Sequence, residues 1–156
     1  MKIGERIIRN DNLEFVVIPR SSGDITFYFK PVLDDQAFEE LVKQPKPPLK
    51  MDGETKTFLY DDPDYLKAFT DFYEKKKAWM FLMSISATKD LTWDGVDMGN
   101  PSTWCKYEEE LKSVGFTIVE RNLIEQGYEK VNCLNQDHLD AARNRFLAGI
   151  PETKTN

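Results

Sequence analysis

Few side chains in this 156-residue sequence could carry out catalysis. The one histidine is His138, and the only cysteines are Cys105 and Cys133. A catalytic triad built on histidine, or an ordinary zinc site, needs more histidine or cysteine side chains than these. We therefore expect His138 to be incidental, at the first position of a helix. We expect both cysteines to be reduced, buried thiols inside helices.

Carboxylates are the other candidates for chemistry, and they occur in three groups: residues 61–62, Asp94 with Asp97, and residues 108–110. Paired carboxylates perform acid–base catalysis only where their surroundings separate their pKa values. Two of the groups lie at predicted helix starts or on a polar helix face, where the helix dipole and solvent account for them. The loop 94–99 lacks the alternating acidic ligands and the terminal glutamate of an EF-hand. The sequence thus predicts no enzyme, no metal site and no cofactor.

The overall charge also excludes classes of partner. The formal net charge is −6, and the one basic cluster, Lys75 to Lys77, spreads around a predicted helix. Phosphate contact requires clustered cations, so we expect no nucleic-acid partner. No stretch approaches eighteen apolar residues and the first residues lack the apolar run of a signal peptide, which predicts no membrane partner and residence in the cytosol.

Residues 91–104 are the most distinctive stretch, with two tryptophans, two aspartates, two glycines and a proline. Asn100 and Pro101 form a helix start, in which Asn caps the helix and Pro takes the first helical position. Trp93 and Trp104 are large apolar side chains that can anchor the loop to a core. These residue types indicate architecture or recognition instead of catalysis.

The first third of the chain carries strand signals. Residues 13–18 and 24–30 are rich in β-branched and aromatic side chains, and a turn segment joins them. In the second run Ile25, Phe27 and Phe29 alternate with polar or half-polar residues, as in a half-buried strand. Residues 3–8 add a short first strand. A two-stranded sheet is marginal in water, so helices or another chain must cover it.

The middle of the chain connects this β portion to the helices. Asp34 or Asp35 can cap a short helix that carries Phe38 and Leu41. Residues 44–50 hold three prolines in four positions, which predicts a stiff, extended strap on the surface or a spacer. Residues 51–60 are predicted to form a turn and a short strand.

Beyond Asp62 the sequence predicts mainly helix, over residues 63–86, 101–113, from Thr117 onward, and from Asp137 to about residue 149. Thr117 and Glu120 form a capping box. Gly127 lies within the third of these helices, and its cost of about 1 kcal/mol relative to Ala predicts close packing of another element there. The apolar side of that helix is predicted to contain Val119, Leu123, Val131 and Leu134. In the last helix Leu139, Ala142 and Phe146 are expected to face inward.

These elements predict an α+β fold: a small N-terminal antiparallel β-sheet or hairpin beside about four helices, mainly helical after residue 62. We expect a single domain over residues 1–150, made of a β portion (1–33), the Pro-rich strap (44–50) and a helical portion (62–149). Residues 151–156 form a polar tail.

The helix over residues 63–86 has an apolar stripe that is expected to face the core. Its members, at spacings of three, four and seven, are Tyr65, Phe69, Phe72, Trp79, Met80 and Met83. Further apolar side chains extend around the helix, and a helix that is apolar on more than one face either lies centrally in the domain or contacts a partner. The candidate partner-binding residues are Tyr73, Trp79, Phe81 and Ile85. Self-association of the chain stays open as an alternative to a different partner.

A series of motifs between residues 28 and 148 carries a family resemblance, and the most specific part runs from Trp93 to Trp104. The motifs are Lys30-Pro31-Val32-Leu33, Phe38-Glu39-Glu40-Leu41, the Pro-rich strap, Asp62-Pro63-Asp64-Tyr65, the long aromatic helix, Leu91 with Trp93 and Val96, Asn100-Pro101 with Thr103-Trp104, Glu109-Glu110-Leu111 with Gly115-Phe116, and Leu139 with Ala142-Arg143 and Phe146-Leu147. Together they resemble small proteins encoded among the virion genes of long-tailed bacteriophages, many of which are labelled tail assembly chaperones. Residues 1–27 match nothing characteristic of that family.

The resemblance implies a non-enzymatic assembly factor in the host cytoplasm. Such a factor coats the apolar, helical tape-measure protein until tail tube subunits displace it, so the implied partners are the tape-measure protein or other tail proteins. Two alternatives stay open: a structural subunit of the phage virion, in the tail or neck, and a phage-encoded module that binds a host protein.

Overall fold

The computed structural model describes residues 2–3, 6–7, 13–132, 140 and 143–144, and these form an α+β fold, as predicted. The predictions for Cys133, Leu134, His138, the last helix from Asp137 and the polar tail fall outside the residues that it describes. The described elements are β1 (Lys2–Ile3), β2 (Arg6–Ile7), β3 (Glu14–Ile18), β4 (Ile25–Phe29), α1 (Gln36–Leu41), β5 (Leu49–Asp52), β6 (Thr55–Phe58), α2 (Pro63–Ile85), the 3₁₀ helix η1 (Pro101–Thr103), α3 (Lys106–Ser113) and α4 (Ile118–Asn132).

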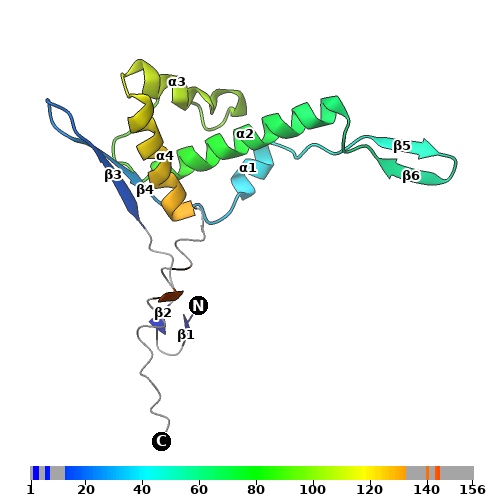
Figure 1. Cartoon of the computed structure of the whole chain (residues 1–156), viewed down its shortest axis with the longest axis horizontal. Coiled ribbons are helices and arrows are strands. Elements are labelled where there is room, and N and C mark those ends of the chain that lie inside the picture. Colours follow the sequence, from blue (N-terminus) through cyan, green and yellow to red (C-terminus); the bar gives the residue numbers. More distant parts are fainter. Residues whose placement is uncertain (1, 4–5, 8–12, 133–139, 141–142, 145–156) are drawn as a thin grey trace, which may run out of the picture.

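Strands β3 and β4 form the predicted antiparallel hairpin, and its inner face belongs to the core. The register pairs Val16 with Phe27 and Ile18 with Ile25. Phe27 and Phe29 are buried, as the alternation predicts. Helices α2 and α4 lie against this hairpin (Figure 1), and they provide the cover that two strands need.

Helix α4 approaches the hairpin at Gly127. A Cβ atom at this position would lie 2.6 Å from Phe29 Cε2 and 2.7 Å from Val16 Cγ2, so only glycine permits this approach. The predicted close packing at Gly127 is therefore confirmed.

The predicted apolar side of α4 is wrong in large part. Val119 and Leu123 are exposed, whereas Ile124 and Tyr128 are buried. The face of α4 that packs against the body contains Ile124, Gly127, Tyr128 and the partly buried Val131. Leu123, although four residues from Gly127, lies at the edge of this face and is exposed to solvent.

Helix α4 begins with the predicted capping box. The Thr117 hydroxyl accepts a hydrogen bond from the Glu120 N–H (3.2 Å), and the Glu120 carboxylate accepts one from the Thr117 N–H (2.8 Å). The same carboxylate pairs with Arg20, from the turn after β3. Glu120 thus joins the start of α4 to the hairpin.

Helix α2 begins at the predicted cap and has two different halves. The Asp62 carboxylate accepts a hydrogen bond from the Tyr65 N–H (2.9 Å), and Pro63 takes the first helical position. Most buried residues of α2 lie in its C-terminal half, which crosses the body of the molecule. The N-terminal half extends beyond the body (Figure 1).

A buried polar network joins α2, α4 and the end of β4. The Ser84 hydroxyl donates to the Lys30 carbonyl (2.7 Å) and accepts from the Asn132 amide (2.9 Å). The Asn132 side-chain oxygen accepts from the Val32 N–H (2.7 Å). Since each buried polar group has a partner, the network holds these three elements in one arrangement.

The tryptophan loop is anchored as predicted, although the helix that follows it is interrupted. The Asn100 carboxamide accepts from the Ser102 N–H (3.2 Å) at the start of η1, and α3 begins only at Lys106. Trp104 is fully buried, and its indole N–H donates to the Asp97 carbonyl (3.1 Å). Trp93 is half-buried against the core.

Glu110, which we expected on a solvated face, has a structural role. Its carboxylate accepts hydrogen bonds from the N–H groups of Asp94 (2.9 Å) and Gly95. It therefore fixes the loop to α3.

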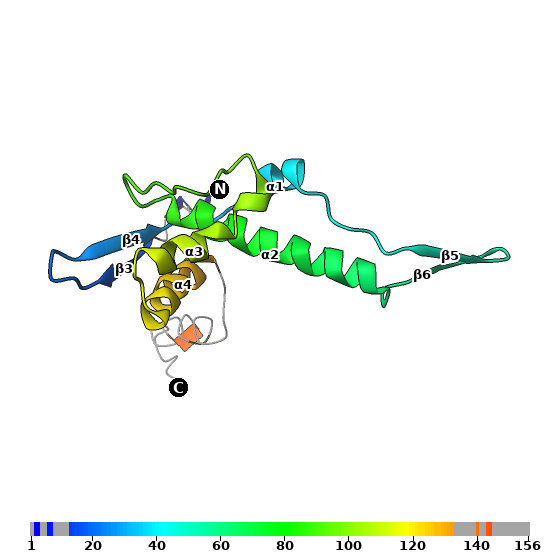
Figure 2. The same ribbon diagram turned by 90° about the horizontal axis from the view of Figure 1, so that it is seen from above.

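Strands β5 and β6 form a second hairpin that projects away from the body beyond the start of α2 (Figures 1 and 2). The sequence predicts only a turn and one short strand here. Gly53, at φ +60°, begins a two-residue turn between Asp52 and Thr55, a position in which glycine is favoured. The Pro-rich segment runs from α1 into β5. We call β5, β6 and the N-terminal half of α2 the arm.

Candidate functional site

The four residues predicted to bind a partner do not share one exposed surface. Tyr73 is 54% exposed, but Trp79 and Phe81 are each 3% exposed and Ile85 is fully buried. The last three face the body, where α2 is surrounded by β4, α4 and η1. Phe81 stacks on Tyr107 at 4.4 Å between ring centroids. The expectation that these three are available to a partner is therefore wrong, because α2 is central to the fold along its C-terminal half.

A row of accessible aromatic residues lies instead along the arm. Five rings contact one another in sequence, with centroid separations of 6.2, 6.3, 5.6 and 4.8 Å. We call this row the aromatic stripe, and its members are Phe58, Tyr60, Tyr65, Phe69 and Tyr73. Three of them, Phe58, Tyr60 and Tyr73, are more than half exposed. Tyr73 also contacts Phe72, whose ring meets Phe38 in the core, so the stripe continues into the body.

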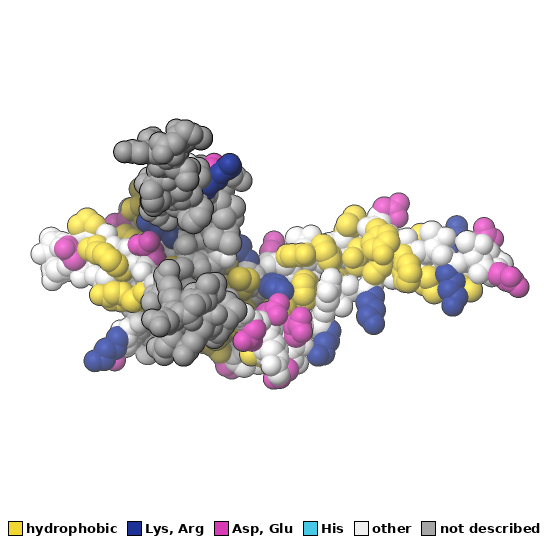
Figure 3. Space-filling view, turned by 90° about the horizontal axis from the view of Figure 1, so that it is seen from below, with side chains coloured by type: hydrophobic (Ala, Val, Ile, Leu, Met, Phe, Trp, Pro, Cys, Tyr) yellow, Lys and Arg dark blue, Asp and Glu magenta, His cyan; other side chains and the backbone are white. Residues whose placement is uncertain are grey.

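The β5–β6 hairpin extends the stripe. Its register pairs Leu49 with Phe58 and Met51 with Lys56, which places these four side chains on one face. The opposite face carries Lys50, Asp52, Thr55 and Thr57. Every residue of both strands is exposed, so the hairpin has an apolar face that the described part of the chain leaves uncovered. Figure 3 shows apolar side chains gathered along the arm.

The arm has the properties of a protein-binding surface. Large contiguous apolar patches on a protein surface usually mark interaction sites. Tyr and Phe are preferred there because each provides a large, stiff contact area. The sequence signal for the hairpin was available: Asp52-Gly53 lies between residues that alternate in polarity, which is typical of a tight hairpin turn.

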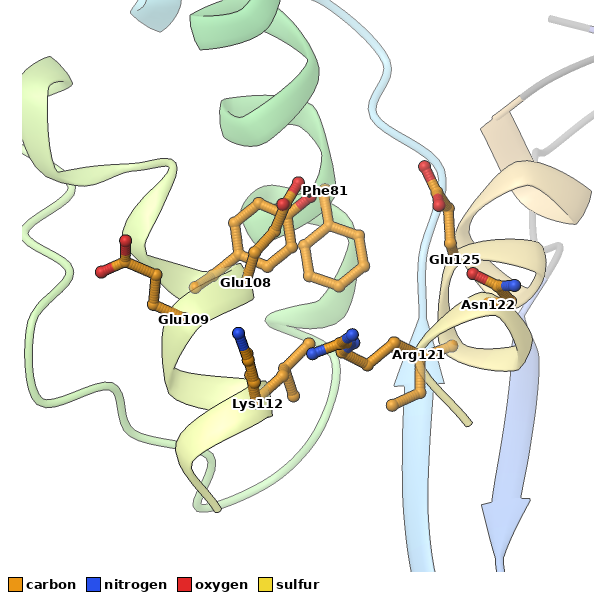
Figure 4. Close-up of a pocket in the computed structure, with 10 residues that line it drawn as sticks. Phe81, Glu108, Glu109, Lys112, Arg121, Asn122 and Glu125 are labelled. Carbon is orange, nitrogen blue, oxygen red and sulfur yellow. Dashed lines mark hydrogen bonds between the residues drawn. The ribbon is translucent and has the colours of Figure 1, made fainter. Parts of the chain in front are cut away.

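A second candidate site is a surface pocket of about 420 Å³ between α3 and α4. Phe81, Leu111 and Ile124 form its apolar floor, and charged side chains line its rim (Figure 4). Lys112 and Arg121 extend into the gap from the two helices, with glutamates nearby. Burial and the neighbouring Glu108 carboxylate raise the pKa of the Tyr107 phenol well above its usual range. Tyr107 therefore stays protonated and does not provide a base.

Cys105 is also in an environment that disfavours chemistry. We predicted a buried thiol within a helix, but Cys105 is exposed and precedes α3. Partial desolvation and the carboxylates of Glu108, Glu74 and Asp71 raise the pKa of this thiol. The reactive thiolate is thus suppressed at neutral pH.

Two further observations concern ligands and membranes. Within the described residues, no three His, Cys, Asp or Glu side chains are grouped so that they could hold a metal ion. The helices of that same part of the chain include none long and apolar enough to cross a membrane.

Comparison of the chain with models of protein families, with curated proteins and with solved structures finds no match.

Proposed function

We propose that this protein is a non-enzymatic binding protein that holds an apolar helical segment of another protein on its aromatic stripe. The observation that supports this proposal is the row of contacting aromatic rings that continues the apolar face of the hairpin. A partner helix could lie along this row and place apolar residues three and four positions apart on the rings. The chain has a formal net charge of −6, which favours solubility of the complex and disfavours contact with DNA.

In the reading that follows from the family resemblance, the partner is the phage tape-measure protein. The chain then acts as a tail assembly chaperone in the host cytoplasm, and it leaves before the particle is complete. The apolar side chains of a long helical protein need such cover until the tail tube surrounds them.

Co-expression of the chain with the tape-measure protein of the same genome tests this proposal. We expect a soluble complex that survives purification, and we expect Tyr60→Ala with Tyr73→Ala to reduce the amount of partner recovered about tenfold. Phe15→Ala is a matched control, because Phe15 is an equally exposed aromatic residue on the outer face of the β3–β4 hairpin. A tape-measure protein that is equally soluble without the chain contradicts the proposal.

The second candidate function is that of a structural subunit of the virion. The projecting hairpin favours it, since both its strands have open edges that can join the sheet of a neighbouring subunit. Mass spectrometry of purified phage particles separates the two functions. A structural subunit is present in fixed stoichiometry, and a chaperone is absent.

A further inference from the structure

The arm is exposed to an extent that a two-stranded hairpin does not tolerate well by itself. Isolated hairpins are marginally stable in water, and all eight strand residues of β5 and β6 are exposed. The apolar face of the hairpin and the stripe on α2 form one surface, and nothing else in the described part of the chain buries it. The free protein therefore gains stability if another apolar surface covers the arm.

We propose that this surface is the arm of a second copy of the chain, and that two arms pack antiparallel around a two-fold axis. In this arrangement the β5–β6 hairpin of one copy lies over the N-terminal half of α2 of the other. An apolar stripe is self-complementary, as the isologous contact of a two-fold dimer requires. The inference goes beyond the proposed function, because it concerns the protein without any phage partner.

The charges of the arm favour the antiparallel arrangement. Residues 61–67, at the start of α2, carry three acidic side chains and one basic one: Asp61, Asp62 and Asp64, with Lys67. Further along the helix, Asp71 is paired with Lys75. Residues 46–58 carry three lysines and two acids: Lys46, Lys50 and Lys56, with Asp52 and Glu54. Lys56 shares the apolar face of the hairpin with Leu49, Met51 and Phe58, so antiparallel packing brings Lys56 toward the acidic start of the facing helix. Parallel packing would place the two acidic segments against each other, where like charges repel.

The apolar area of the arm is adequate for a dimer. Six large side chains are 46–63% exposed: Leu49, Met51, Phe58, Tyr60, Leu66 and Tyr73. An aromatic side chain has about 150–250 Å² to bury, so the three half-exposed rings alone offer roughly 300 Å², and the three aliphatic side chains add to this area. The half-buried Tyr65 and Phe69 and the polar side chains at the edge of the arm increase the area that each copy can bury. The total approaches the roughly 800 Å² per partner of a standard interface.

The oligomeric state of the full-length protein alone tests the proposal. Sedimentation equilibrium should show a reversible dimer, and Phe58→Ser with Tyr60→Ser should raise the dimer dissociation constant about tenfold or more, as for central interface aromatics. Phe15→Ser is the control, since Phe15 lies on the other exposed apolar face, and it should leave the dimer unchanged. A monomer at every concentration overturns the proposal. So does a dimer that Phe15→Ser dissociates while the arm variant does not.

A charge exchange tests the antiparallel arrangement with substitutions that touch only exposed positions. Lys56→Glu should weaken the dimer about tenfold at low salt, and adding Asp61→Lys should restore it. Circular dichroism of each variant verifies the helix content. An unchanged dissociation constant after Lys56→Glu overturns the antiparallel arrangement. Recovery of the tape-measure protein is a separate measurement, so failure of the dimer and failure of the proposed function are distinguishable.

Discussion

Gly127 in α4 packs directly against the ring of Phe29 in β4, and the missing side chain of Gly127 is what permits this contact. A Cβ atom would lie 2.6 Å from Phe29 Cε2, and Phe29 is itself fully buried. Neither the ring nor the helix can move away without disturbing the core, because interiors are close-packed.

Gly127→Ala should therefore destabilise the protein even though alanine favours a helix. Overpacking costs about 1–3 kcal/mol, and the gain in helix propensity of about 1 kcal/mol offsets only part of it. Urea denaturation measures the net loss. Gln126→Ala, at the neighbouring exposed position, should change the free energy of unfolding by less than about 0.5 kcal/mol. A gain in stability for Gly127→Ala would contradict the close contact of Gly127 with Phe29.

Trp104 should be the largest single anchor of the loop 91–104. Trp104→Ala removes a fully buried ring and should cost about 3–5 kcal/mol. Trp104→Phe keeps most of the apolar volume but loses the indole N–H that donates to the Asp97 and Met98 carbonyls, which should cost about 1–2 kcal/mol. Chemical denaturation distinguishes the two variants. A loss below about 1 kcal/mol for the alanine variant would contradict a core position.

Phe81 and Tyr73 lie on the same helix, but their replacement by alanine should lower the free energy of unfolding by very different amounts. Phe81 is buried and stacked on Tyr107, so Phe81→Ala should lower the free energy of unfolding by about 3–5 kcal/mol. Tyr73→Ala removes an exposed ring and should cost less than about 1 kcal/mol. Thermal unfolding gives the stabilities, and co-purification of a partner gives the binding. If Tyr73→Ala reduces recovery of the partner only to the extent that it unfolds the protein, the aromatic stripe is not the binding surface.

Acid should remove a stabilising contribution from Glu120. The hydrogen bonds from Arg20 and from the Thr117 backbone lower the pKa of this carboxyl to about 2 in the folded protein, from an ordinary value of 4.5. A carboxyl whose pKa is lower in the folded state stabilises the fold above its unfolded pKa and ceases to do so as the pH falls to its folded pKa. The contribution should therefore be complete above about pH 5 and should disappear between about pH 4.5 and pH 2.

Thermal unfolding of the wild type and of Glu120→Gln from pH 6 to pH 2.5 measures this effect. The wild type should have the higher midpoint at pH 6, and the difference should narrow on acidification. The Lys76 ammonium lowers the pKa of Asp35 in the same direction, but it does so in both proteins, so the difference reports Glu120. A difference that is independent of pH would contradict the lowered pKa.

Several local features were predictable from the sequence because residues close together in the chain create them. The cap at Asp62 and the capping box of Thr117 and Glu120 involve residues three positions apart, and both are confirmed. The alternation of Phe27 and Phe29 with their neighbours predicted the buried face of β4. The cost of a glycine within a helix indicated close packing at Gly127.

The faces of the helices were less predictable, and so was the candidate site. Periodicity indicates which residues share a face, but it does not identify what covers that face. On α4 the contact with the hairpin turns Ile124 and Tyr128 inward and leaves Val119 in solvent. On α2 the predicted apolar stripe is buried toward the C-terminal end, and its N-terminal members Tyr65 and Phe69 are only half-buried, because the body covers only the C-terminal half.

The sequence alone thus determined the α+β class, the positions of most elements and the caps of α2 and α4, since each of these depends on neighbouring residues. The tertiary structure decided which aromatic residues remain accessible on the arm. That choice depends on contacts between residues sixty to a hundred positions apart, such as the Tyr28 N–H with the Thr88 hydroxyl and Arg20 with Glu120. Such contacts position the β3–β4 hairpin and the helices relative to one another, and the aromatic residues that lie beyond them on the arm stay exposed.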